Sequence, residues 1–361
     1  MRIAFYAPLK SPNHPIVSGD RQIARLLVRA LGLTGDTVEV VSELRSYLPA
    51  PDFGMLEDLQ RAAASERDRL TALWRSGSPP DIWFTYHPYY KSPDLIGPAL
   101  ATAFSIPYVT AEASFSRRRA IAAWAESQSY VGAAVRAAAV NFCLTRRDKE
   151  GLNNNIPEAS LAMLSPFIDV TPFAPAPDKG RHKLVTVAMM RPGDKLESYA
   201  RLAEALHLIP QRQWTLSIVG DGPCREAVHQ LFSGFETERI TWHGELSQPE
   251  VAALLSTSDI YVWPGCGEAF GLAYLEALAS GLPVVAQDTS GVSEVVTNGK
   301  TGLLTQDGDS AAYAAAIERL LDNRSERDLL GSQARFEALE THSLEAAAQR
   351  LSEVIGRVRK S

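Results

Sequence analysis

Two glutamates, Glu268 and Glu276, stand on either side of a point where a helix is expected to begin. A buried strand is predicted just upstream, at Ile260–Trp263. A strand, a glycine-containing loop and a helix start form an anion site, because free backbone N–H groups and the helix dipole both favour a phosphate there. The segment therefore predicts a phosphate-binding helix start with an acid on each side, placed to bind hydroxyl groups.

The surroundings of the two acids matter more than their spacing. Two glutamates at this spacing are by themselves more typical of a solvated surface helix. Here Phe270, Leu272, Leu275 and Leu278 form an apolar stripe, which indicates a packed helix. The order of strand, glycine loop, acid, helix, acid and next strand therefore favours a ligand site.

Two cations follow the strand predicted at Lys183–Met189. Arg191 and Lys195 could place two positive charges on a diphosphate, because ligands bind at strand ends in such sheets and arginine suits bidentate phosphate contacts. A polar loop with two solvated cations explains these residues equally well. Gly220 opens a turn after another strand, but the three-glycine spacing of a dinucleotide site is missing.

The first half of the chain offers three more candidates at predicted strand ends. Gly19 precedes a helix expected near Arg21, and it could approach a phosphate or sugar closely. His87 lies in an aromatic cluster that serves either as a sugar platform or as packing, and Glu112 follows the strand Tyr108–Ala111. The arginines 117–119 are expected to open the next helix as a solvated turn, with an anion- or headgroup-binding patch as the alternative.

Composition limits the class of protein. The 361 residues, 45% apolar and 22% charged, suit a folded protein with two domains. A net charge of −6 argues against general nucleic-acid binding. The three cysteines are scattered, which predicts no disulfide framework, no metal site and a reducing cytoplasm. No apolar run is long enough to span a bilayer, although peripheral contact with a membrane is compatible with the sequence.

Short apolar runs alternate with helical patterns along the whole chain. This alternation predicts an α/β fold with two Rossmann-like, doubly wound domains and a ligand in the cleft between them. The predicted divisions are a first domain at 1–170, a proline-rich linker at 171–182, a second domain at 183–342 and a C-terminal helix at 343–361 that crosses back to the first domain.

With these residues assembled, the chain resembles the retaining glycosyltransferases of family four, which have the GT-B fold. The resemblance is strongest over residues 184–304, where the motifs occur in the family's order. The motif residues are Arg191 with Lys195, the segment Val219–Pro223, the segment Trp242–Leu246, and Glu268 with Glu276.

The resemblance implies a role for each residue. Glu276 would bind the ribose of a nucleotide-sugar and Glu268 the donor sugar, while Arg191 and Lys195 would neutralise the leaving diphosphate. No metal or other cofactor is implied, because these two cations would do the work of a metal ion. The remaining contacts to the donor would come from Gly19, Gly220, Gly244, Leu246, Phe270, Gly271 and Leu272.

The resemblance implies transfer of a hexose from a UDP- or GDP-sugar to a hydroxyl of a glycan, lipid-linked or small acceptor. No carboxylate pair suits double displacement. The resemblance instead implies a front-face route with retention. Two features depart from the family. The Arg–Lys spacing is shorter, and Glu112 stands where many members carry a histidine, which leaves Glu112 or His87 to contact the reacting groups. The alternatives are a sugar-nucleotide epimerase, a phosphorylase, a non-catalytic nucleotide-sugar binder and a scaffold protein.

Overall fold

The computed structural model describes residues 1–16, 18–120, 123–175 and 182–358. The chain forms two compact units, Met1–Ser165 with Leu344–Ser361 and Pro166–Ser343. The first unit therefore ends at residue 165 rather than at the predicted 170. The cause is local, because the backbone N–H of Ile168 donates to the carbonyl of His342 at 2.9 Å within the second unit. Residues 176–181 of the predicted linker lie outside the described residues.

The first unit contains a parallel sheet with the strand order β2-β1-β3-β4-β5-β6. Its central strands are buried on both faces, as β3 shows along its whole length, so the sheet must be covered by helices on both sides. The strands are β1 Arg2–Tyr6, β2 Thr37–Val40, β3 Ile82–Tyr86, β4 Tyr108–Ala111, β5 Val140–Cys143 and β6 Leu161–Met163.

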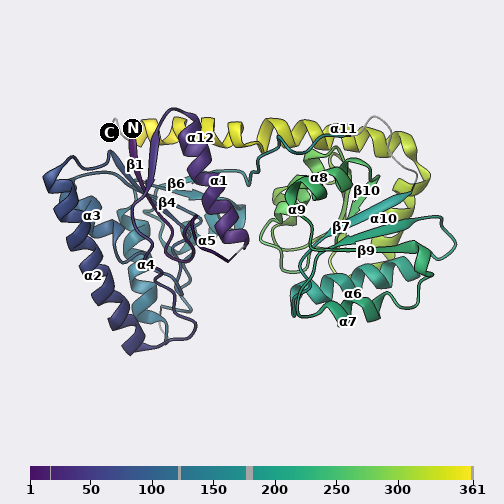
Figure 1. The fold of residues 1–361 in the computed structure, drawn as a ribbon, viewed down its shortest axis with the longest axis horizontal. Helices are drawn as coiled ribbons and strands as arrows, with labels where there is room; N and C mark the ends of the chain where they lie inside the picture. The colour runs from purple at the N-terminus through teal and green to yellow at the C-terminus, as the bar shows by residue number, and fades with distance from the viewer. Residues whose placement is uncertain (17, 121–122, 176–181, 359–361) are drawn as a thin grey trace. The chain divides into compact units, whose positions relative to one another are not determined.

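Helices cover this sheet in two groups (Figure 1). Helices α2, α3 and α4 pack against β1, β3 and β4 through one apolar core that includes Trp74, Trp83 and Leu100. Helix α12 of the C-terminus packs along α1. The helices are α1 Gly19–Leu33, α2 Phe53–Ser76, α3 Gly97–Phe104, α4 Ala125–Ala137, α5 Arg146–Asn155 and α12 Leu344–Val358.

The second unit repeats the plan with the parallel strand order β12-β11-β10-β7-β8-β9. Its strands are β7 Lys183–Val187, β8 Thr215–Val219, β9 Ile240–Gly244, β10 Ile260–Val262, β11 Val284–Asp288 and β12 Gly302–Gln306. Its helices are α6 Asp194–His207, α7 Arg225–Leu231, α8 Gln248–Ser256, α9 Leu272–Ala279, α10 Ser310–Asp322 and α11 Arg324–Thr341, with short 3-10 turns η1 Thr237–Arg239 and η2 Val292–Glu294.

One predicted helix starts later than expected. The arginines 117–119 lie in hydrogen-bonded turns ahead of α4, not in its first turn. Among the residues that the structure describes, no helix has both the length and the apolar character needed to cross a membrane.

Candidate functional site

In the second unit, the loop between β10 and α9 holds Glu268 in a fixed position. The backbone N–H of Glu268 donates to the carbonyl of Gly265 at 3.1 Å, and its carbonyl accepts from Gly291 at 2.9 Å. A Cβ on Gly291 would stand 1.4 Å from the carbonyl oxygen of Ala269, so only glycine allows the two loops to approach this closely. Packing of backbone against backbone thus sets the direction of the Glu268 side chain.

The side chain of Glu268 is held by two donors. Lys195 forms an ion pair with the Oε1 atom of Glu268, and the indole N–H of Trp263 donates to the same oxygen at 3.1 Å. The Lys195 ammonium also lies 5.6 Å from the centre of the Trp263 ring. The structure therefore brings together one acid and one base from segments 73 residues apart.

Helix α9 begins next to this pair without a side-chain cap. Gly271 occupies the N-cap position with φ of 79°, a conformation that favours glycine. An uncapped helix start leaves backbone N–H groups for a ligand or water to bind. The sequence prediction of an anion-binding helix start at Phe270, Gly271 and Leu272 therefore agrees with the local geometry, although the bound group remains a prediction.

Glu276 lies on α9, one turn past its start. Its carboxylate has no hydrogen-bond or ion-pair partner in the part of the chain that the structure describes, although it is only partly exposed. Burial raises the pKa of Glu276 from 4.5 to about 7. An enclosed acid without a partner is costly to the folded protein, which is typical of a side chain kept for a ligand.

Arg191 and Gly220 were both predicted to contact the donor, and their surroundings in the structure differ from that expectation. Arg191 is exposed, and no described residue pairs with its guanidinium, so Lys195 alone is joined to the Glu268 group. A Cβ on Gly220 would meet the carbonyl oxygen of Ala188 at 1.9 Å. Gly220 is therefore required by the close contact of two loops, and this packing accounts for it without a ligand.

Gly244 and Leu246 lie at the end of β9 and in the loop after it. The backbone of Gly244 has φ of 66°, and its carbonyl accepts from Gly220 at 2.7 Å. Apart from its neighbours in the chain, no described atom stands within 4 Å of the place where its Cβ would be. Packing therefore leaves this point open, and a role in binding the base stays a prediction.

In the first unit, His87 and Glu112 occupy equivalent positions directly after β3 and β4. Both have left-handed backbones, with φ of 57° and 59°. Such angles are uncommon in residues other than glycine, and they concentrate at functional sites. The backbone N–H groups of both residues donate at 2.8 Å to neighbouring strands, so the sheet itself holds the two side chains at its carboxyl edge.

The side chains around His87 form a polar group with unfilled hydrogen-bonding capacity. The Nδ1 atom of His87 lies 3.1 Å from Oδ1 of Asp20, and its ring stacks on Tyr89. The buried Oε2 atom of Glu112 and the Tyr86 hydroxyl make no hydrogen bond within the described residues. Tyr86 is near enough to influence the pKa of Glu112, but the two groups lack the geometry of a hydrogen bond.

Burial and neighbouring charges shift the pKa values of His87, Glu112 and Asp20 in opposite directions. Burial lowers the pKa of His87, but the Glu112 charge and the Asp20 contact outweigh it and raise the pKa above 6.5. Burial raises the pKa of Glu112 above 4.5, and the charge of His87 opposes the rise only in part. Burial also acts to raise the pKa of Asp20, yet the hydrogen bond from His87 brings it below 3.8. The group thus combines a histidine that holds its proton more tightly than usual with oxygen acceptors for hydroxyls.

The Asp20–His87 contact gives a testable pH dependence. Because the folded pKa of His87 is raised, its contribution to stability is complete below the unfolded pKa and is lost as pH rises through the folded pKa. Asp20→Asn should lower the histidine pKa and cost about 0.5–1 kcal/mol at about pH 5, where both groups are charged, but little at high pH; the cost is small because the pair is partly exposed. NMR titration of the histidine and thermal unfolding across pH measure both effects. Asp68→Asn, at an exposed position of α2, is the control. If Asp20→Asn lowered the stability equally at all pH values, the Asp20–His87 ion pair would be contradicted.

Gly19 begins α1, two residues earlier than predicted, with Ser18 as its N-cap. The Ser18 hydroxyl accepts from the backbone N–H of Arg21 at 3.3 Å. No described atom lies within 4 Å of the position that a Cβ on Gly19 would occupy. Protein packing does not demand glycine here, so close approach of a ligand remains the prediction for this residue.

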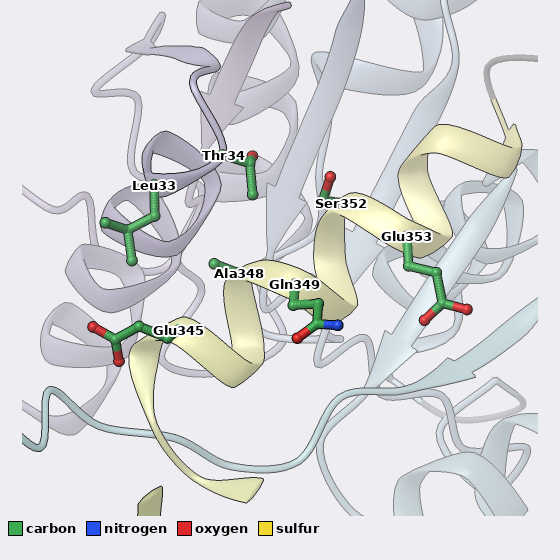
Figure 2. Close-up of a pocket in the computed structure, with 7 residues that line it drawn as sticks. All are labelled: Leu33, Thr34, Glu345, Ala348, Gln349, Ser352 and Glu353. Carbon is green, nitrogen blue, oxygen red and sulfur yellow. The ribbon is translucent and has the colours of Figure 1, made fainter. Parts of the chain in front are cut away.

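A hollow between α1 and α12 lies away from these groups (Figure 2). Helix α1 starts at the carboxyl edge of the sheet and ends at the opposite edge, where Leu33 and Thr34 contribute to the hollow. Its other lining side chains come from α12 and include two acids but no base. In open α/β sheets ligands bind at the carboxyl edge, so this hollow is a poor candidate for the functional site.

Three residues of these groups were not predicted from the sequence. Trp263 was assigned only to a strand, Asp20 only to a helix start, and Asp148 was not singled out. The available signal was the position of Trp263 directly after a strand, and of Asp20 and Asp148 in the first turn of a helix that follows a strand. Within the described ranges, no group of three or more His, Cys, Asp or Glu residues could hold a metal ion.

Among the comparisons with known proteins, the match to a protein family falls in the second unit. Residues 181–323 match the family described as Glycosyl transferases group 1. A sulfoquinovosyl transferase of Arabidopsis thaliana is 32% identical over 39% of this chain and 27% of its own length. A GDP-mannose-dependent phosphatidylinositol monomannoside mannosyltransferase of Mycolicibacterium smegmatis is 29% identical over 55% of this chain and 57% of its own. The chain therefore spans well under two thirds of either relative.

Solved structures extend the likeness to both units. HepE from Anabaena, solved in complex with UDP, matches with a TM-score of 0.75 and 15% identity over 99% of this chain and 100% of its own. The two doubly wound units thus define a two-domain α/β protein of the GT-B fold, as predicted. The match of residues 181–323 to the group 1 glycosyltransferases agrees with the family that the motifs of this chain resemble.

Proposed function

We propose that the protein transfers a hexosyl group from a nucleoside-diphosphate sugar to an acceptor hydroxyl, with retention and without a metal ion. The observation that carries this proposal is the arrangement of Lys195, Glu268 and Glu276 around the uncapped start of α9. A cation, an anion-binding helix end and two acids correspond to the parts of a nucleotide-sugar: diphosphate, hexose and ribose. The match of residues 181–323 to the family Glycosyl transferases group 1 supports the same assignment.

In the proposed step, the bond between the anomeric carbon and the diphosphate oxygen breaks, and its electron pair stays on the diphosphate. The acceptor oxygen forms the new bond on the same face of the sugar, and its proton passes to the departing phosphate. Lys195 stabilises the negative charge that grows on the leaving group, and such placed charges usually give the largest single contribution to catalysis. Glu268 orients the sugar through its hydroxyls.

A donor screen tests this function. The full chain is incubated with UDP-glucose, UDP-GlcNAc or GDP-mannose in the presence of a chelator, first alone and then with acceptor mixtures. Slow hydrolysis of one donor alone, with release of a sugar whose anomeric configuration is first retained, supports the proposal. Binding of a donor without turnover under any condition would instead favour a nucleotide-sugar binder, and conversion of the donor sugar into another sugar nucleotide would favour an epimerase.

A further inference from the structure

A pocket of about 400 Å³ opens on the first unit, and Ser114 in its wall stands two residues after Glu112. Asp148 also lines the pocket, and its negative charge acts to raise the pKa of both Glu112 and His87. The pocket is lined by Ser114, Phe115, Ser116, Arg118, Arg119, Arg147, Asp148, Gly151 and Leu152. The turn after β4 and the first half of α5 therefore form its walls.

The charge of this pocket is opposite to that of the protein. Three arginines line it in a chain whose net charge is −6, and the one acid is Asp148. That acid already accepts a hydrogen bond from the hydroxyl of Thr145 at 2.6 Å and therefore has a partner. The surplus of positive charge is thus available to an anion.

Two of the arginines are uncommitted. Arg118 and Arg147 are exposed, and no acid within the described ranges pairs with either guanidinium. The third, Arg119, stacks over the Tyr90 ring at 3.8 Å, which fixes its position. Arginine presents a planar fork of donors that matches the oxygens of a phosphate, so two free guanidiniums at one pocket favour such a group.

The remaining surroundings of the pocket suit the same ligand. Ser114 and Ser116 bring hydroxyl groups to the wall. Helix α5 begins at Arg146 after its N-cap Thr145, so the positive end of its dipole lies at the pocket as well. These neutral donors and the helix end add to the attraction that the arginines provide.

We propose that this pocket binds an anionic group of the acceptor, a phosphate ester, through Arg118 and Arg147. The neighbouring Glu112 and His87 then contact hydroxyls of the same molecule. Naming the ligand as the acceptor rests on the proposed transfer reaction, whereas binding of a phosphate by this pocket does not. The phosphate belongs either to a free metabolite or to a lipid headgroup.

Binding is tested first, on the full chain and with inorganic phosphate as the probe. Thermal unfolding is followed in rising phosphate against chloride of equal ionic strength, in an R191Q background that weakens phosphate binding by the second unit. We expect R118Q/R147Q to weaken the phosphate effect about tenfold or more, because two charge-assisted hydrogen bonds are lost. R117Q is the control, since it removes one positive charge next to Arg118 from a side chain that does not line the pocket. Equal loss in both variants would overturn the site.

Vesicles separate the two sources of phosphate. Cosedimentation with phosphatidylcholine vesicles, with and without phosphatidylinositol, is measured for the same variants. If binding needs phosphatidylinositol and the two arginines, the phosphate is that of a headgroup. If free phosphate alone stabilises the protein, the acceptor is a soluble phosphate ester. A protein that responds to neither probe would overturn the proposal.

Turnover then separates this proposal from the proposed function. With a hydrolysed donor identified, phosphorylated polyols are compared with the same polyols lacking phosphate. The variant R118Q/R147Q should raise the acceptor KM about tenfold and leave donor hydrolysis unchanged. Equal use of neutral acceptors with an unchanged KM would overturn the anion site alone. Absence of donor turnover would overturn the transfer reaction alone, since the phosphate titration stands without it.

Discussion

Replacing Glu268 with glutamine should lower turnover by about a hundredfold or more, the cost typical of removing one placed charge or donor from an active site. The amide has the size of the carboxylate and can still accept from Trp263, which donates at 3.1 Å in the native protein. It carries no negative charge to pair with Lys195 or to orient sugar hydroxyls. The expected loss is therefore in kcat more than in folding.

The fold of this variant should be nearly as stable as that of the native protein. Lys195 is 26% exposed, so its charge can be solvated when the partner acid is gone, at a cost of about 1 kcal/mol or less. Donor hydrolysis and thermal unfolding are measured side by side, with Glu340→Gln on exposed α11 as the control. Turnover equal to that of the native protein in Glu268→Gln would remove Glu268 from the mechanism.

A companion change tests the pairing itself. Lys195→Gln should also lower turnover, because the leaving diphosphate then lacks a cation. If the two residues act as a unit, the double variant should be scarcely slower than the worse single one. Independent, multiplying losses would show that Lys195 and Glu268 act on separate parts of the donor.

The sheets of this protein could be predicted because their strands are short apolar runs bounded by polar or glycine-rich turns. Strands β4 and β10 match the predicted positions, Tyr108–Ala111 and Ile260–Trp263, to within one residue, since burial on both faces leaves little freedom in their composition. The predicted start of α4 was wrong because the sequence of residues 117–124 continues a helix-like pattern, whereas the structure has hydrogen-bonded turns at the arginines. A local sequence pattern does not distinguish such turns from a longer helix.

For the site residues, too, some features could be predicted from the sequence and others could not. Strand ends directed attention to His87, Glu112 and Glu268, because parallel strands bring their carboxyl ends to one edge. Pairings could not be predicted, since Asp20 and His87 are 67 residues apart and join only when the strand order places β1 beside β3. The left-handed backbone angles of His87 and Glu112 could not be predicted either, because neither position holds a glycine.

Replacing Glu276 with glutamine should have opposite effects on stability and on donor binding. The folded pKa of about 7 lies above the ordinary 4.5, so the folded state favours the neutral acid. Its contribution to stability is complete below the unfolded pKa and declines as pH rises to the folded pKa, beyond which it stays constant. The neutral amide avoids this penalty, so Glu276→Gln should gain about 1–2 kcal/mol at about pH 8, after allowance for partial exposure, and little at about pH 4.5.

Donor binding should change in the other direction. An ionised carboxylate is the stronger acceptor for a pair of ribose hydroxyls, and losing it should weaken UDP or GDP binding about ten- to a hundredfold. Native affinity should rise more steeply than that of the variant as pH passes through about 7, where Glu276 ionises. Calorimetric titration with UDP and GDP across pH measures this, with Glu340→Gln again as the control. A variant that is more stable yet binds as tightly as the native protein would make Glu276 a buried acid without a ligand, whereas both changes together would show that the folded chain gives up stability to keep a carboxylate ready for the nucleotide.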